Sequence, residues 1–129
     1  SSMGGFTPVP GQTVYGASKA AVKLLTEGLY AEMRGTSVAV SVVFPGGVAT
    51  GIADNSGAAR DGMGDDISKA AARLTTPQAA AEQIVDAVRS GAYRVVIGKD
   101  AKGLDVMMRL NPRRATDLIA KKMASLIAK

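Results

Sequence analysis

The chain has 129 residues, 47% of them hydrophobic, which is enough for one small domain with a packed core. Cysteine and histidine are both absent, which excludes disulfides, thiolate nucleophiles, histidine-based triads and most transition-metal sites. The formal net charge of +5 lies entirely in residues 99–129, which hold eight basic and three acidic residues, whereas residues 1–98 hold eight of each. This is not the pattern of a uniformly basic nucleic-acid-binding domain, and we expect no nucleic-acid partner.

The first eleven residues read as the end of a strand followed by a loop, because residues 7–11 have the composition of a loop. Such a loop could return Ser2 to the neighbourhood of Tyr15. Tyr15 and Lys19 stand four residues apart at the start of a predicted helix, so they share one helix face. A nearby cation and a helix N-terminus both favour a phenolate, which makes a tyrosine able to exchange a proton during turnover. Taken alone, this spacing also fits a plain helix start with a solvated lysine, and Ser2 also fits a turn serine.

One long helix is predicted from Gln12 to Met33, with Gly35 as its stop. Its polar residues form a single stripe, made of Lys23, Glu27, Tyr30 and Arg34. The rest of its circumference is apolar, which is more than packing on one sheet face requires. Two explanations are open: the helix lies inside a large core, or part of it packs against a partner subunit.

The run from Val38 to Phe44 is almost continuously apolar and rich in β-branched residues. It predicts a strand that is buried on both faces, and therefore a parallel sheet. Pro45-Gly46-Gly47 ends the strand, and ligands of open parallel sheets bind beyond the carboxyl ends of strands. We therefore expect Gly46 to Thr50 to lie at a site where glycine lets the backbone approach a ligand closely. An ordinary strand-to-helix turn would also need glycine.

The remainder of the chain predicts alternating loops, helices and one more strand. Residues 51–66 read as a loop, followed by a short helix near residues 67–74. The acidic residues of this loop do not have the spacing of a calcium site, and we expect no metal. Thr76 as N-cap and Pro77 as the first helical residue start a helix that runs to Ser90, with Gly91 after it. Its predicted inward residues are Ala80, Ile84, Ala87 and Val88.

A second strand is predicted at residues 93–97, which completes a strand–helix–strand crossover. Two further helices are predicted at residues 101–110 and 113–128. Leu118 and Ile119 lie on the apolar side of the last helix, and its lysines and arginines form its polar surface. This basic helix fits a tail docked on the body better than a surface-binding module. Contact with a membrane is possible but not favoured.

Three motifs, in order and at the expected spacings, resemble the short-chain dehydrogenase/reductase family. They are Ser2, then Tyr15-Gly16-Ala17-Ser18-Lys19 thirteen residues later, then Pro45-Gly46-Gly47-Val48-Ala49-Thr50 after the next strand. The resemblance implies an α/β fold, with residues 1–129 as the C-terminal, nicotinamide-side part of a doubly wound parallel-sheet Rossmann-type domain. The family's glycine-rich turn and its Asn-Asn-Ala-Gly strand end do not occur in the sequence. We therefore expect the dinucleotide-binding half to be absent from this chain.

The resemblance also implies the chemistry, which is hydride transfer between NAD or NADP and a carbonyl/alcohol substrate. Tyr15 would be the general acid/base, Lys19 would assist it and bind the nicotinamide ribose, and Ser2 would hydrogen-bond the substrate oxygen. The implied cofactor-binding residues are Tyr15, Lys19, Pro45, Gly46, Val48 and Thr50. Among them, the backbone of Val48 would contact the nicotinamide carboxamide, and the Thr50 hydroxyl would reach the carboxamide or the pyrophosphate.

The helix that carries Tyr15 to Arg34 usually forms the dimer interface in this family, so we expect a homo-oligomer, a dimer or tetramer. The alternative function is a catalytically degenerate member that serves as an interaction or dimerisation module. No apolar run of transmembrane length or signal-peptide pattern occurs, and we expect a cytoplasmic protein. The substrate and the choice between NAD and NADP are not readable from these residues.

Overall fold

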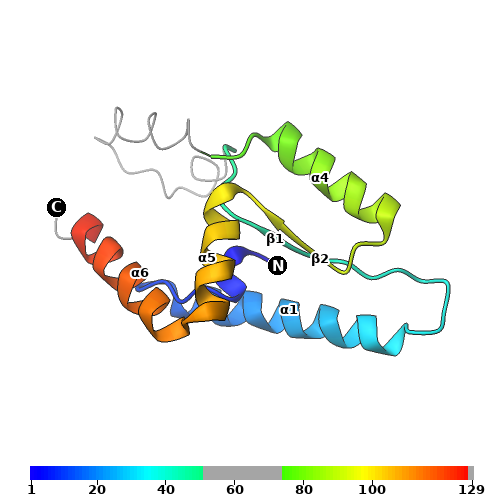
Figure 1. Cartoon of the computed structure of the whole chain (residues 1–129), viewed down its shortest axis with the longest axis horizontal. Coiled ribbons are helices and arrows are strands. Elements are labelled where there is room, and N and C mark those ends of the chain that lie inside the picture. The colour runs from blue at the N-terminus through cyan, green and yellow to red at the C-terminus, as the bar shows by residue number, and fades with distance from the viewer. Residues whose placement is uncertain (51–73, 128–129) are drawn as a thin grey trace.

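The computed structural model describes residues 1–50 and 74–127, which form two parallel strands and the helices around them. The strands are β1 (Val42–Pro45) and β2 (Arg94–Ile97), and the helices are α1 (Thr13–Glu32), α4 (Pro77–Ser90), α5 (Lys99–Leu110) and α6 (Pro112–Ile127). A single 3₁₀ turn, η1 (Met3–Gly5), precedes α1. Figure 1 shows α4 on one side of the strands and α1 on the other. This is the α/β layering of part of a doubly wound Rossmann-type fold, as the sequence predicts. The loop expected at residues 51–66 and most of the helix expected near residues 67–74 lie outside the described residues.

The parallel sheet is shorter than the sequence predicts. β1 pairs with β2 in a register that runs from Val42 opposite Arg94 to Pro45 opposite Ile97. Phe44 and Ile97 are fully buried, so the strands form the centre of the core. The prediction of a strand from Val38 to Phe44 is wrong at its start, since Val38 is 56% exposed and lies in no ladder. Only four residues of β2 are available as partners, and a strand forms only where backbone groups can pair.

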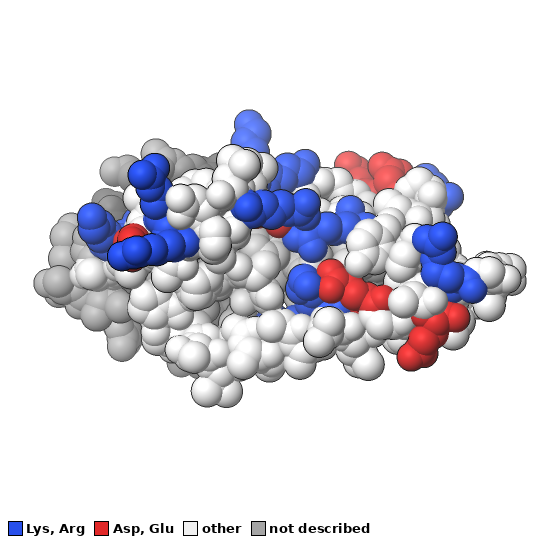
Figure 2. Space-filling view, turned by 60° about the horizontal axis from the view of Figure 1, so that its bottom comes forward, with Lys and Arg blue, Asp and Glu red and all other residues white. Residues whose placement is uncertain are grey.

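Helix α1 has the predicted bounds to within one residue, but its polar side faces the body and its apolar side faces outward. Its polar stripe lies inward: Lys23 and Glu27 form an ion pair at 2.7 Å, and the ring of Tyr30 lies 4.3 Å from that of Tyr93. Its large apolar side chains point outward, and the most exposed are Val14, Leu24 and Leu25. In Figure 2, where the bottom of Figure 1 is turned forward, the lower part of the surface is mostly uncharged. No residue of α1 is buried within the described part of the chain, so its apolar face has no cover there.

The ends of α4 are set by local capping, as predicted. The hydroxyl of Thr76 accepts a hydrogen bond from the Ala79 amide at 3.2 Å, Pro77 occupies the first turn, and Gly91 adopts the left-handed conformation with φ 65°. Thr76 thus pairs one of the free amides of the first turn, and Gly91 ends the helix without a side-chain clash.

The predicted inward face of α4 is only half right. Ala80 and Ala87 are buried, but Ile84 is 40% and Val88 71% exposed. Small residues allow α4 to approach β2 closely along one narrow line. A sheet of two four-residue strands is too small to cover the helix beyond Ala80 and Ala87, so Ile84 and Val88 remain at the surface.

Helices α5 and α6 pack against each other, and α6 docks on the body as expected. The side chain of Asn111 accepts a hydrogen bond from the Arg114 amide at 3.0 Å and so caps α6, which starts at Pro112. Ala115 and Ile119 are the buried residues of α6, whereas Leu118 is 50% exposed. Basic side chains gather at the end of the molecule that α6 forms, at the left of Figure 2. Among the described residues, no helix is both long enough and apolar enough to cross a membrane.

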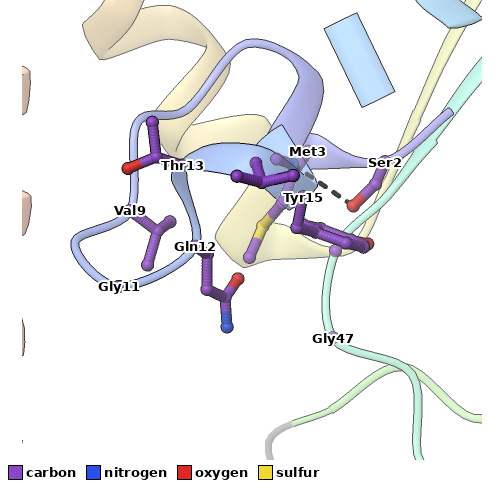
Figure 3. Close-up of a pocket in the computed structure, with 11 residues that line it drawn as sticks. Ser2, Met3, Val9, Gly11, Gln12, Thr13, Tyr15 and Gly47 are labelled. Carbon is purple, nitrogen blue, oxygen red and sulfur yellow. Dashed lines mark hydrogen bonds between the residues drawn. The ribbon is translucent and has the colours of Figure 1, made fainter. Parts of the chain in front are cut away.

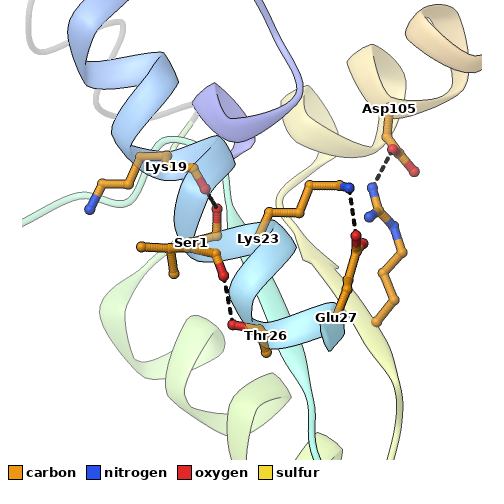
Figure 4. A network of polar contacts seen from close by, with 8 residues as sticks. Ser1, Lys19, Lys23, Thr26, Glu27 and Asp105 are labelled. Atoms are coloured by element: carbon orange, nitrogen blue, oxygen red, sulfur yellow. Dashed lines mark hydrogen bonds and ion pairs between the residues drawn. The ribbon is translucent and has the colours of Figure 1, made fainter. Parts of the chain in front are cut away.

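A half-buried ion pair joins β2 to α5 next to the core aromatic rings. The guanidinium of Arg94 lies 2.7 Å from Asp105, and the dashed line that ends at Asp105 in Figure 4 marks this ion pair. The same guanidinium lies 4.2 Å from the ring centroid of Phe44. The side chains of Arg94 and Asp105 are only 18% and 15% exposed. Phe6 closes the cluster from the N-terminal loop, with its ring 5.3 Å from that of Phe44.

Removal of the Asp105 carboxylate should therefore destabilise the fold. Asp105→Ala leaves the Arg94 charge without its partner in a mostly apolar setting, and we expect the free energy of unfolding to fall by about 2 kcal/mol. The matched control is Asp86→Ala, because Asp86 pairs with Arg89 at 3.9 Å with both side chains about three-quarters exposed. This control should change stability by no more than about 0.5 kcal/mol. Urea unfolding measures both, and equal effects would contradict a structural role for the Arg94–Asp105 pair.

Candidate functional site

The N-terminal turn lies flat against the first turns of α1 because glycine occupies the contact positions. A Cβ on Gly4 would lie 3.0 Å from the Tyr15 ring, and one on Gly5 would lie 2.9 Å from the Lys19 carbonyl oxygen. A Cβ on Gly16 would meet the Gly4 carbonyl at 3.2 Å. All three distances are shorter than side chains normally tolerate. The three glycines thus allow the N-terminal turn to lie close to α1, and any larger residue would push the two apart.

Ser2 is brought beside Tyr15 by this packing. In place of the expected end of a strand, Ser2 caps η1: its backbone is extended, and its hydroxyl accepts a hydrogen bond from the Gly4 amide at 3.2 Å. The strand expectation is wrong: Ser1 and Ser2 lie in no ladder, and the residues that follow form the turn η1. The hydroxyl of Ser1 donates to the Lys19 carbonyl at 2.8 Å and ties the segment to α1.

Ser2, Tyr15 and Gly46 line one pocket of about 670 Å³. Its other lining residues are Met3, Gly4, Val9, Gly11, Gln12, Thr13, Val14 and Gly47. Figure 3 shows Ser2, Tyr15 and Gly47 together on one side and Val9, Gly11 and Gln12 on the other. The volume is in the range of small-molecule sites, and none of these lining side chains carries a charge. Members of all three sequence motifs, Ser2, Tyr15 and Gly46, thus meet at one place although they are spread over more than forty residues of the chain.

Lys19 lies next to Tyr15, as the four-residue spacing predicts, but it does not line the pocket. Its ammonium is 5.4 Å from the centroid of the Tyr15 ring, within the range of a cation–π contact. The Tyr15 side chain itself is half exposed. The pair therefore combines a phenol that opens to the pocket with a cation on the flank of that phenol.

The segment from Pro45 to Thr50 contributes backbone to the pocket at its start and leaves it toward its end. Pro45 is the last residue of β1, and Gly46 and Gly47 line the pocket. Val48 forms a parallel bridge with Thr75 and does not line the pocket. Thr50 is exposed and likewise is not a lining residue.

Two features of the site escaped the sequence analysis. Gln12 lines the pocket from the N-cap position of α1, where its side chain makes no capping hydrogen bond. It lies three residues before Tyr15, so helical spacing could have indicated it. The second is Asp100 of α5, whose carboxylate accepts a hydrogen bond from the Gly47 amide at 2.8 Å. These residues are 53 positions apart, and no spacing rule connects them.

The wall made by Gly46 and Gly47 suits a flat ring. It carries no side chains and lies in the same pocket as the Tyr15 phenol, so a planar heterocycle could lie against backbone while a substrate oxygen reaches the phenol. The residues present thus fit the nicotinamide end of a dinucleotide.

Comparison with known proteins points in the same direction. A family model described as short chain dehydrogenase matches residues 1–61, which include all the candidate site residues. "Putative oxidoreductase SadH" of Mycobacterium tuberculosis is 38% identical over 132 aligned positions, which cover 96% of this chain and 47% of that protein. "Uncharacterized short-chain type dehydrogenase/reductase y4eK" of Sinorhizobium fredii is 43% identical over 51 residues, 40% of this chain and 21% of that protein. The chain thus spans half or less of the length of these relatives, and no solved structure matches it significantly.

Proposed function

Because the chain belongs to the short-chain dehydrogenase/reductase family, we propose that it is the nicotinamide-side catalytic part of an NAD(P)-dependent oxidoreductase. The substrate is an alcohol or a carbonyl compound, and the cofactor is NAD or NADP. The observation that carries the proposal is the pocket in which Ser2 and Tyr15 meet the backbone of Gly46 and Gly47.

Tyr15 is the proton donor and acceptor in this proposal. Its phenol opens to the pocket and has the Lys19 ammonium on its flank, 5.4 Å from the ring centroid. Ser2 lies in the same pocket, and its hydroxyl hydrogen-bonds the substrate oxygen and so holds that oxygen within reach of Tyr15. A bound nicotinamide would supply the hydride to a carbonyl substrate or accept it from an alcohol, and the protein supplies geometry and charge.

The cofactor-binding role falls on the turn after β1 and on Lys19. Gly46 and Gly47 form the wall for the nicotinamide ring, Pro45 sets the start of this turn at the end of β1, and Lys19 reaches the ribose hydroxyls. Val48 and Thr50 stand farther along the same segment, outside the pocket lining, and take the carboxamide and the pyrophosphate side. The pyrophosphate itself needs a glycine-rich turn at a helix N-terminus, which we assign to the family's N-terminal half.

We further propose that the outward apolar face of α1 is an oligomer interface between two copies of the protein. Val14, Leu24 and Leu25 are 85%, 70% and 67% exposed on this face. A continuous apolar surface of this kind is typical of a site that another surface covers. The interaction-module alternative uses the same face, without catalysis.

The direct test is turnover by the full-length protein, meaning residues 1–129 together with the N-terminal half that we assign to it. Primary and secondary alcohols are offered with NAD or NADP, and aldehydes and ketones with the reduced cofactors, while the nicotinamide absorbance is followed. We expect turnover of at least one substrate class with at least one cofactor. A protein that forms dimers but neither binds a dinucleotide nor turns over any substrate would favour the interaction module.

A further inference from the structure

Asp100 stands where the two strands end, beside the glycine turn of the pocket. The ladder between β1 and β2 continues one bond beyond the strands, since the Gly46 amide donates to the Ile97 carbonyl at 2.8 Å. Gly98, at φ 97°, then turns the chain into α5. Asp100, in the first turn of that helix, reaches back and accepts the hydrogen bond from the Gly47 amide.

The glycines around Asp100 make room for its carboxylate. A Cβ on Gly46 would lie 2.4 and 2.6 Å from the two carboxylate oxygens, and a Cβ on Gly98 would lie 2.4 Å from one of them. Real Cβ atoms do not approach oxygen so closely. For Gly46, the nearest obstacles to a side chain are all atoms of Asp100. A side chain at Gly46 would therefore displace the Asp100 carboxylate from the position in which it accepts the Gly47 hydrogen bond.

The turn is held from two opposite directions. On one side, Asp100 fixes the Gly47 amide. On the other, the Thr75 amide donates to the Gly47 carbonyl at 3.0 Å, and the Ala49 amide donates to the Thr75 carbonyl at 2.9 Å. A hydrogen bond to an ionised carboxylate is stronger than one between neutral groups, and a negative charge is favourable in the first turn of a helix. Both amide and carbonyl of Gly47 are thus paired, and the backbone wall of the pocket has little freedom to move.

We propose that Asp100 is a positioning residue for the cofactor: it holds the Gly46–Gly47 wall at the distance from Tyr15 that a nicotinamide ring requires. This inference rests on the proposed function. Asp100 does not line the pocket, so it acts through the backbone of Gly47 and touches neither substrate nor cofactor. Its hydrogen bond to the Gly47 amide connects the start of α5 to the pocket, although no residue of α5 lines that pocket.

The test compares two substitutions of Asp100 in the full-length protein. Asp100→Asn removes the charge but keeps a side-chain oxygen that can accept the Gly47 hydrogen bond, whereas Asp100→Ala removes both. We expect Asp100→Ala to raise the Kd and the KM of the cofactor about tenfold while kcat falls by less than about threefold. Asp100→Asn should keep the cofactor Kd within about threefold of the wild-type value.

Asp105→Ala is the control for a loss of stability alone. Asp105 lies on the same helix and pairs with Arg94 and Arg109, away from the pocket. It should lower the Tm and leave the cofactor Kd unchanged at temperatures well below unfolding. An Asp100→Ala variant with the wild-type cofactor Kd would overturn the positioning role alone. A wild-type protein that binds neither NAD nor NADP would overturn the proposed function as well.

A second measurement does not depend on the cofactor. Gly46→Ala in the wild-type background forces a methyl group against the Asp100 carboxylate and should lower the Tm by about 4 °C. In the Asp100→Ala background the carboxylate that opposes the methyl group is gone, so Gly46→Ala should lower the Tm by less than half as much. Equal costs in the two backgrounds would show that Asp100 does not press on the turn, and the proposal would fail even if Asp100→Ala folds too poorly for a binding measurement.

Discussion

Replacement of Tyr15 by Phe should lower kcat by about 100-fold or more in the full-length protein. The substitution keeps the ring that packs on Gly4 and removes the hydroxyl of this pocket-lining residue. General acid/base catalysis by a positioned side chain is worth about 100- to 10,000-fold, and the chain has no histidine or cysteine to take over the proton. The Kd of the cofactor should change much less than kcat, because the loss of the transferable proton acts mainly on the transition state.

Tyr30→Phe is the matched control for this experiment. Tyr30 lies on the same helix and loses the same hydroxyl group, but its ring packs against Tyr93, and its hydroxyl accepts a hydrogen bond from Arg34 at 3.4 Å. The pocket does not include Tyr30 among its lining residues. We expect wild-type kcat for Tyr30→Phe. Wild-type turnover in Tyr15→Phe would remove Tyr15 from the mechanism and with it the catalytic assignment of the site.

The parts of the fold that sequence predicts well are those set by neighbouring residues. The bounds of α4 follow from Thr76, Pro77 and Gly91, whose capping roles need no tertiary information. The adjacency of Tyr15 and Lys19 follows from helical spacing in the same way. The motifs that indicate the family are local too, which is why they could be found in half the length of the known relatives.

The parts that sequence predicts poorly depend on residues far along the chain. The length of β1 is set by how many residues of β2 pair with it, some fifty positions later. The exposure of Ile84 and Val88 depends on how much of α4 the sheet covers. The contact between Asp100 and Gly47 has no local signature at all. It becomes visible only once β1 and β2 are known to be neighbours and to end at the same edge.

The last prediction concerns residues 1–129 on their own: they should bind NAD and NADP weakly or not at all and show no turnover. The described residues form only two four-residue strands, and two-stranded sheets are marginally stable without further cover. The apolar face of α1 also lacks cover within the described part of the chain. Most of the affinity for a dinucleotide should come from the pyrophosphate and adenosine sites, which we assign to the N-terminal half.

Calorimetric titration of the 129-residue chain is therefore compared with titration of the full-length protein and of the two halves mixed as separate chains. Joined or mixed halves should restore both binding and turnover, with circular dichroism reporting whether the short chain is folded at all. Micromolar binding by the 129-residue chain alone would place the anion site within these residues and would show that the division into two halves is wrong.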